Sequence, residues 1–354
     1  MITDKKFAPD YFTITYLVEE DEDGVRLDQF LGKYNPSFSR EELKRRIKSG
    51  VVEILDRPGK HKPTTKLRTG DRLTMTLHKT THEDEYWNGE QLVLDLIPKI
   101  IFEDDDLIVI SKPPYMATHP TGKHLFNCAT VHFGNIHDKT IHSIHRLDRE
   151  TSGVLLLGKS PKTAQDLTPL FEEGLVRKAY FFMAKISEDY KGSPDFNCDL
   201  RMGTESTGMD RVYIHSYPND DTRGKSAETD FKVLFTNNGY ALGLAFPKTG
   251  RQHQIRVHAK ANGLPLVGDK LYLGSYKMFQ GFKDLYASKE DHDLMELPRH
   301  ALHAVAIYFD YKGEKRLFKA ALPKDFLPWI KDKFEIKDDE LESRIEVELK
   351  NYFK

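Results

Sequence analysis

Beyond residue 98 the sequence contains many short apolar strand patterns and few helix patterns. Strands in succession, with helices interspersed irregularly, are typical of an α+β domain and not of a sheet wound from alternating strands and helices. We therefore predict an α+β fold with a mixed, mostly antiparallel sheet over residues 99–330. The strands are expected at residues 107–110, 154–157, 179–186, 229–235, 240–246, 303–311 and 316–321.

Helices are expected at three places in and after this domain. A Ser-Pro pair at residues 160–161 combines an N-cap with a proline at the first helical position, which predicts a helix through residue 171. A second helix is predicted over residues 251–261. The charged tail, residues 331–354, is expected to dock as a helix because four apolar residues share one helical face. These are Leu341, Ile345, Leu349 and Tyr352.

Residues 11–78 have a pattern of their own and predict a separate, small α/β domain. Ser39 and Gly50 mark the N-cap and the C-cap of one of its two helices. The polar and acidic residues 79–98 that follow are expected to form a linker. Within the small domain we expect strands at residues 12–18, 51–55 and 72–77, and helices at residues 26–34 and 40–49.

Basic residues are concentrated in this small domain. The whole chain has 53 basic and 55 acidic residues, but residues 40–72 hold eleven Lys and Arg against five Asp and Glu. Arg40 and Lys44 lie four residues apart, with Arg45 beside them, so they share a basic helix face that suits a polyanion. A solvated helix face without a partner is the alternative.

Composition excludes several classes of protein. The chain has no apolar run of about 18 residues and no signal or transit sequence at its start, so we expect a cytoplasmic protein that is not bound to a membrane. Its two cysteines are too few for a disulfide framework. Its 15 histidines form no recognisable metal motif, and the glycine-rich nucleotide loops are absent. We expect neither a metal nor a nucleotide cofactor.

A polar segment, residues 145–153, runs directly into the apolar strand at 154–157. A carboxylate on a turn at the mouth of a buried strand is well placed to act as a nucleophile, which makes Asp148 a candidate. Arg146 lies two residues earlier, so in extended backbone both side chains face the same side. An ordinary turn in which Asp148 bonds backbone amides is the alternative.

Two further segments could complete a site. If residues 251–261 are helical, Gln252 and Arg256 share a face, and Arg256 could keep a carboxylate ionised. A basic surface helix is the alternative. Tyr180 could stack on a planar substrate, although a tyrosine in a strand is more often part of the core.

Three motifs resemble those of the RluA-type pseudouridine synthases. Their order and spacing agree with that family across residues 100–322. Residues 11–77 resemble the alpha-L RNA-binding domain, which often precedes this catalytic domain. The motifs are His-Arg-Leu-Asp with Thr-Ser-Gly at 145–153, Arg-Lys-x-Tyr at 177–180, and Thr-Gly-Arg-x-His-Gln-Ile-Arg-Val-His at 249–258 followed by Gly-Asp at 268–269.

The resemblance implies a reaction that uses neither metal nor organic cofactor. Asp148 would be the nucleophile on the target uridine, and Arg256 would pair with it and hold it as the anion. Tyr180 would stack on the uracil and take part in proton loss from C5. Arg146 would fill the gap left when the uridine is flipped out of its stack. Further RNA contacts are expected from His145 and Arg251, and from Arg40, Lys44 and Arg45 of the small domain.

The implied partner is RNA, with large-subunit ribosomal RNA expected because the N-terminal domain commonly accompanies such targets in this family. Transfer RNA is the alternative substrate, and we expect a monomer. A non-catalytic RNA-binding or ribosome-assembly factor on the same fold is a second hypothesis, and a metal-dependent nuclease is a third.

The sequence departs from the family pattern outside the predicted catalytic residues. Tyr115 stands where the family usually has glycine, and Leu273 is an extra residue between Tyr272 and Gly274. A charged insertion then covers residues 275–298. We expect these departures to alter RNA recognition and not to remove activity.

Overall fold

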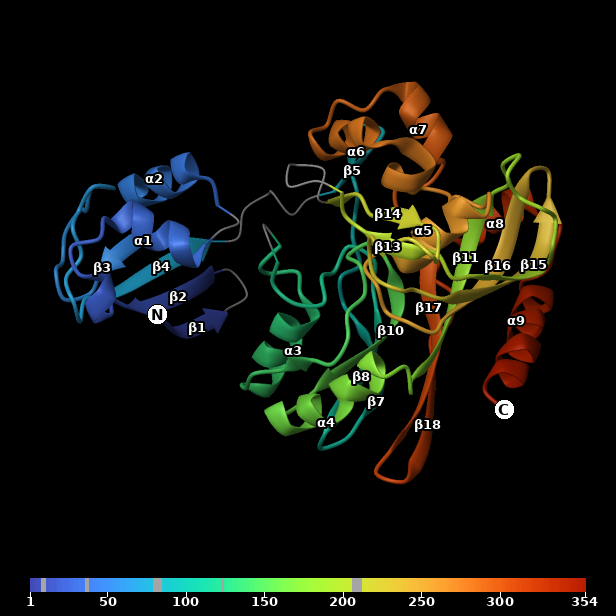
Figure 1. Ribbon diagram of the computed structural model, residues 1–354, viewed down its shortest axis with the longest axis horizontal. Helices are drawn as coiled ribbons and strands as arrows, with labels where there is room; N and C mark the ends of the chain where they lie inside the picture. Colours follow the sequence, from blue (N-terminus) through green and yellow to red (C-terminus); the bar gives the residue numbers. More distant parts are fainter. Residues whose placement is uncertain (8–10, 36–37, 79–84, 122–123, 206–211) are drawn as a thin grey trace. The chain divides into compact units, whose positions relative to one another are not determined.

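The computed structural model describes residues 1–7, 11–35, 38–78, 85–121, 124–205 and 212–354 (Figure 1). The chain divides into two compact units. The first unit contains residues 1–83 and 119–139, and the second unit contains residues 84–118 and 140–354. Residues 79–84 of the predicted linker lie outside the described residues.

The first unit is built around a four-stranded antiparallel sheet in the order β1-β2-β4-β3. The predicted strands and both predicted helices are present, and their apolar side chains meet in one core. The sequence does not predict β1, because half of its residues are charged and suit an exposed edge strand. The elements are β1 (Ile2–Phe7), β2 (Tyr11–Leu17), η1 (Glu20–Glu22), α1 (Leu27–Tyr34), α2 (Arg40–Ser49), β3 (Val52–Ile54), β4 (Arg72–His78) and α3 (Ala129–His137).

The second unit contains a ten-stranded sheet in the order β12-β15-β16-β11-β17-β10-β8-β7, with β18 beside β17 and β9 beside β10. β10 and β17 pair in parallel, and the other pairings described in this sheet are antiparallel. The predicted α+β fold is therefore confirmed. The strands are β7 (Lys99–Glu103), β8 (Leu107–Lys112), β9 (His142–Ser143), β10 (Ser152–Gly158), β11 (Arg177–Lys185), β12 (Asp195–Cys198), β15 (Thr229–Asn237), β16 (Tyr240–Pro247), β17 (Leu302–Tyr311) and β18 (Glu314–Lys319).

Helices and two short strand pairs complete the second unit. The last helix, α9, is red in Figure 1, and its buried Leu341, Ile345 and Leu349 join the same core as residues of β11, β16 and β17. The helices are α4 (Pro161–Glu172), α5 (Gln254–Ala261), η4 (Lys270–Gly274), α6 (Tyr276–Lys283), α7 (Lys289–Met295), α8 (Leu327–Lys333) and α9 (Asp338–Tyr352). The strand pairs are β5 (Tyr86–Trp87) with β6 (Glu90–Gln91), and β13 (Arg201–Gly203) with β14 (His215–Tyr217).

The helix predicted over residues 251–261 begins later, at Gln254. His253 precedes it with a φ of 57°, in the left-handed region, and a right-handed helix cannot run through that conformation. Gln252 therefore lies outside the helix that carries Arg256. The prediction that these two residues share a helical face is wrong.

Two departures from the family pattern have a visible structural result. Tyr115 adopts a φ of 66°, the left-handed conformation that a glycine would favour, and its buried ring lies under the Arg149 guanidinium. The extra residue Leu273 lies in η4, a π-helical turn. There the N–H groups of Leu273 and Gly274 both donate to the Asp269 carbonyl, at 3.0 and 3.1 Å. The turn thus absorbs one residue without disturbing Asp269.

The hairpin β5–β6, from the region predicted to be a linker, packs against the second unit. The Glu85 carboxylate forms an ion pair at 2.6 Å with Arg149, the residue that follows Asp148. Trp87 stacks on Phe282 of the insertion, with ring centres 5.8 Å apart, and meets His292 edge to face. The hairpin and the insertion therefore support each other.

Candidate active site

A pocket of about 550 Å³ opens in the second unit between the loop before β10, strand β11 and the start of α5. It brings together all six site residues that the sequence predicts in this unit, although they come from three separate segments. The other three predicted residues lie on α2 of the first unit. The predicted residues that line the pocket are His145, Arg146, Asp148, Tyr180, Arg251 and Arg256.

The loop that carries Asp148 is held from both sides. The Thr118 hydroxyl bonds both the N–H and the carbonyl of Leu147, at 3.1 and 3.2 Å. The fully buried Nζ of Lys112 donates to the Arg149 carbonyl at 3.1 Å. These contacts flank Asp148 and fix the backbone that presents its carboxylate.

Gly153 lets this loop enter β10 close beside β17. Its φ is 109°, and a Cβ at this position would lie 2.2 Å from the Ala304 carbonyl oxygen. Only glycine fits there, because the parallel partner Ala304 occupies that space. The Thr-Ser-Gly turn is therefore required by packing at the strand entrance.

Arg256 is held by one carboxylate and points at another. Its Nε and Nη2 donate to the two oxygens of Asp269 at 2.7 and 2.8 Å, while Nη1 donates to Asp148 Oδ2 at 3.2 Å. Asp269 is fully buried and also accepts the N–H groups of Leu271 and Tyr272. The bidentate pair fixes the plane of the guanidinium, so the third nitrogen is aimed at Asp148.

The charges around Asp148 keep its carboxyl ionised. Burial alone would raise its pKa, but His253, which is protonated in the acid range where Asp148 titrates, and the Arg256 guanidinium outweigh burial and lower the pKa to about 2. The side chain is still 21% exposed, on the pocket side. Asp148 is therefore an accessible anion at neutral pH, as a nucleophile must be.

Tyr180 lies on β11, at an irregularity in the pairing of β11 with β17 that falls between Ala179 and Tyr180. Its ring lines the pocket while its neighbours Ala179 and Phe181 are buried in the sheet. Burial, and then the charge of Asp148, raise the pKa of its hydroxyl. Tyr180 therefore presents a protonated, largely apolar ring to whatever fills the pocket.

Three other predicted residues have different settings. Arg146 is exposed at the pocket, free to reach a ligand. His145 stacks on Phe171, and its Nε2 accepts the Leu156 N–H at 3.1 Å; burial lowers its pKa to about 3, so it is neutral. The Arg251 Nε donates to the Ser226 carbonyl at 3.0 Å. His145 and Arg251 thus also hold the walls of the pocket.

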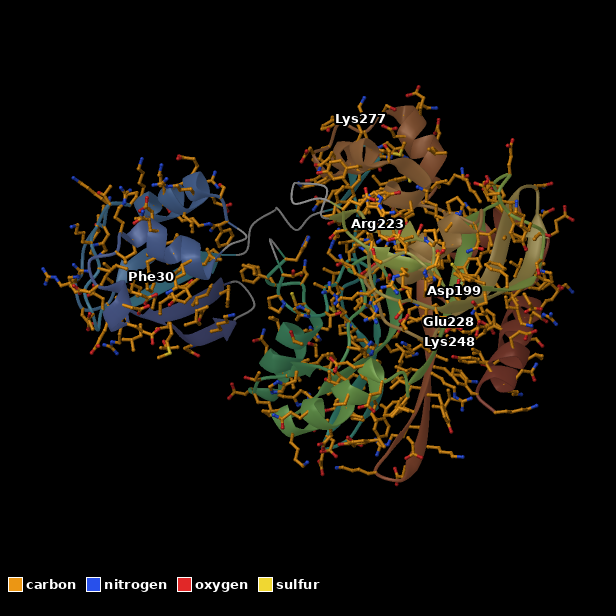
Figure 2. All side chains as sticks on the ribbon, viewed as in Figure 1. Phe30, Asp199, Arg223, Glu228, Lys248 and Lys277 are labelled. Atoms are coloured by element: carbon orange, nitrogen blue, oxygen red, sulfur yellow. The ribbon has the colours of Figure 1, made fainter. Side chains whose placement is uncertain are left out.

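The start of α5 is fastened to the neighbouring strands by Gln254. Its amide nitrogen donates to the Glu228 carbonyl and its amide oxygen accepts the Arg251 N–H, both at 2.9 Å. Glu228 and Lys248, seen together in Figure 2, pair at 2.5 Å at the ends of β15 and β16. This network sets the position from which α5 delivers Arg256.

Sequence reasoning missed four residues of the site that lie within or beside the motifs. Asp269 anchors Arg256, and Tyr272 contacts His253. Lys178 lines the pocket and donates to the Thr249 carbonyl at 3.1 Å, and burial lowers its pKa to about 8. Adjacency to a motif was the available signal, but no spacing rule identifies which neighbour faces inward. The four are Lys178, His253, Asp269 and Tyr272.

The basic residues predicted in the first unit lie on α2. Arg40 and Arg45 are exposed, and Lys44 is partly exposed. Lys44 pairs with Glu41 at 2.6 Å, and Arg40 lies 3.9 Å from the buried carboxylate of Asp28. Acidic neighbours therefore offset part of the positive charge that the spacing predicts.

Among the residues that the structure describes, one trio of acidic side chains lies close enough to share an ion, namely Glu19, Asp21 and Glu22 of the first unit. Glu22 is already bonded to Lys33 at 2.7 Å. No helix in the described segments combines the length and the apolar character needed to cross a bilayer.

Comparison with known proteins identifies the class. Residues 106–261 match the family model of RNA pseudouridylate synthase. The chain is 30% identical to an uncharacterized RNA pseudouridine synthase of Aquifex aeolicus, covering 88% of this chain and 94% of that protein. It is 30% identical to ribosomal large subunit pseudouridine synthase D of Vibrio parahaemolyticus, covering 89% and 92%.

A mitochondrial tRNA pseudouridine(32) synthase of Saccharomyces cerevisiae is 31% identical, with coverage of 76% of this chain and 54% of that protein. The solved structure of human RNA pseudouridylate synthase domain containing 4 shares the fold, with a TM-score of 0.52 and 24% identity. It covers 66% of this chain and 92% of that chain.

The mixed sheet of the second unit and the relatives matched over most of the chain define an RNA-modifying isomerase. The chain belongs to the RNA pseudouridine synthase family, as the resemblance of its three motifs predicts.

Proposed function

We propose that this enzyme converts uridines of large-subunit ribosomal RNA to pseudouridine, with Asp148 as the nucleophile. The observation that carries the residue assignment is the aspartate–arginine–aspartate arrangement, in which Asp269 aims Arg256 at Asp148. A carboxylate so held keeps its charge although its own side chain is mostly buried. A structural turn residue would not need a buried cation directed at it.

The reaction conserves every atom of the nucleotide. The bond between C1′ and N1 breaks, the base turns, a bond forms between C1′ and C5, and the proton leaving C5 is balanced by one gained at N1. Asp148 would form a transient bond to the nucleotide, and Tyr180 would stack on the uracil. Base flipping is required because a stacked uridine cannot reach a side chain at the bottom of a pocket. Exposed Arg146 is placed to fill the gap it leaves.

One observation supports ribosomal RNA as the substrate, and a second supports RNA binding in general. The relative from Vibrio parahaemolyticus is named for the large ribosomal subunit and is matched over 92% of its length. The first unit also carries the exposed Arg40 and Arg45 on one helix, where phosphate contacts would hold the RNA backbone. The yeast relative named for transfer RNA makes that RNA the second candidate.

We further propose that the enzyme acts as a monomer in the cytoplasm. The six predicted site residues of the second unit meet in one pocket of that unit, so the proposed chemistry needs no residue from a second copy of the chain. The composition of the chain, with 31% charged residues, supports an aqueous compartment.

Pseudouridine mapping of total cellular RNA tests the proposal. Cells that lack the protein are compared with cells that express the wild type or Asp148→Asn. We expect sites that disappear from large-subunit RNA on deletion and return only with the wild type. Sites lost from transfer RNA would make transfer RNA the substrate of the same reaction. An unchanged map would contradict the proposed function.

A further inference from the structure

The hydroxyl of Tyr272 has two neighbours, and together they determine where its proton goes. The Ile214 N–H donates to this oxygen at 3.1 Å, so the oxygen is the acceptor there. His253 Nδ1 lies 2.9 Å from the same oxygen. Burial raises the pKa of Tyr272, so the hydroxyl keeps its proton, and Nδ1 is an acceptor within hydrogen-bonding distance of it. A neutral His253 whose Nδ1 accepts this proton carries its own ring proton on Nε2.

The Nε2–H of His253 faces the pocket beside the nucleophile. Nε2 lies 3.7 Å from Asp148 Oδ2, which is too long for a hydrogen bond. The ring is mostly buried, lines the pocket, and is brought there by the left-handed backbone of His253 at the start of α5. A non-glycine residue in that conformation is uncommon and often marks a functional position.

A neutral donor at this position suits the chemistry better than a cation. Burial, and then the adjacent charge of Arg256, lower the pKa of His253 to about 4, so the ring is uncharged at neutral pH. An imidazolium would pair with Asp148 and weaken it as a nucleophile. A neutral N–H leaves the charge of Asp148 available and can still donate to a substrate.

We propose that His253 is a catalytic hydrogen-bond donor to a carbonyl oxygen of the flipped uracil, and that Tyr272 is the positioning residue that locks its Nε2–H tautomer. The inference rests on the proposed function. Whether Asp148 adds to C1′ of the ribose or to C6 of the base, the displaced electron pair moves onto the uracil. Negative charge then builds up on a ring carbonyl oxygen, and His253 stabilises it without transferring a proton.

The test is a double-mutant cycle on single-turnover rates at saturating enzyme, with an RNA fragment that the wild type converts and Asp148→Asn does not. His253→Leu should lower the rate about 100-fold, the usual effect of losing one such donor, with RNA affinity within about threefold of wild type. His253→Gln retains an N–H near the position of Nε2 and should recover the rate to within about tenfold.

Tyr272→Phe distinguishes a tautomer lock from simple packing. It should slow the wild-type enzyme about tenfold but have little effect in the His253→Gln background, because an amide has no tautomer to lock. Tyr213→Phe is the matched control, since it removes a hydroxyl from a ring packed on Tyr272 at 5.1 Å without touching His253. Long-range ¹H–¹⁵N spectra of histidine-labelled protein, assigned with His253→Gln, should show the Nε2–H tautomer directly.

Several results would overturn the inference. A His253→Leu rate within threefold of wild type would exclude the donor, and an equal cost of Tyr272→Phe in both backgrounds would exclude the lock. A spectrum that shows the Nδ1–H tautomer of His253 would also exclude the lock. If the wild type converted none of the RNAs tested, the proposed function itself would fail, which the Asp148→Asn comparison separates from failure of His253.

Discussion

Replacing Asp269 by asparagine should uncouple the arginine from the nucleophile. Asp269 is fully buried and accepts two bonds from the Arg256 guanidinium and two from backbone N–H groups. Removing one partner of a buried ion pair costs about 3–5 kcal/mol. Asparagine retains one acceptor oxygen but turns an N–H₂ toward the guanidinium. We therefore expect a loss in unfolding free energy of about 3 kcal/mol, near the lower end of that range.

The same substitution should slow isomerisation. The Arg256 Nη1 reaches Asp148 at 3.2 Å only because the other two nitrogens are fixed. A displacement of about 1 Å in an active site can cost about 100-fold in rate, so we expect a loss of that order. Single-turnover conversion of an RNA fragment measures it. Urea unfolding followed by tryptophan fluorescence measures the stability of the second unit, because both tryptophans, Trp87 and Trp329, belong to it.

Asp104→Asn is the matched control for this experiment. Asp104 also bonds an arginine, Arg316, and two backbone N–H groups, but it is 31% exposed and does not line the pocket. Loss of this ion pair in Asp104→Asn should lower the unfolding free energy by about 1 kcal/mol or less and leave the isomerisation rate unchanged. If Asp269→Asn changed the unfolding free energy by less than about 1 kcal/mol and the rate by less than threefold, Asp269 would not be the anchor we describe.

Three other predictions concern the nucleophile and the basic helix. Asp148→Asn should bind RNA with unchanged affinity but form no pseudouridine, because an amide is neither anionic nor nucleophilic. Turnover near the wild-type rate would exclude Asp148 as the nucleophile. Neutralising Arg40, Lys44 and Arg45 to glutamine should flatten the slope of log affinity against log salt by about 2, and an unchanged slope would mean that α2 does not contact phosphates. Because the folded-state pKa of Asp148, about 2, lies below its unfolded value, its charge stabilises the fold above about pH 4 and this contribution is lost as pH falls toward 2. The difference in unfolding free energy between wild type and Asp148→Asn should therefore change between about pH 6 and pH 3, and a constant difference would contradict the depressed pKa.

Local sequence signals predicted much of the secondary structure. The Ser39 hydroxyl accepts the Glu42 N–H, and Gly50 ends α2 with a φ of 85°, as their positions predict. The Ser160 N-cap of α4 is likewise present. These features depend on residues within one helical turn of each other, so they can be recognised without knowing the fold.

Elements stabilised mainly by partners distant in the sequence were missed or misplaced. Half of the β1 residues are charged, and the strand is held by pairing with β2 along its length. The hairpin at Tyr86 and Trp87 has few apolar residues of its own and is held by Phe282 and Arg149. The helix α5 starts three residues late, after the left-handed His253, and Gln254 at its start bonds the Glu228 carbonyl, a partner 26 residues away. None of these contacts leaves a periodic signal in the local sequence.

The sequence by itself determined the fold class, the main strands of the sheet, the family, and the residue types available for chemistry at Asp148, Tyr180 and Arg256. These depend on local patterns and on motif spacing, which can be read directly from the linear sequence. Only the tertiary structure decided that Asp269 orients Arg256 and that Tyr272 sets the tautomer of His253. A hydrogen bond requires atoms about 3 Å apart at a suitable angle, and Asp148 and Arg256, 108 residues apart, reach that geometry only when the sheet forms.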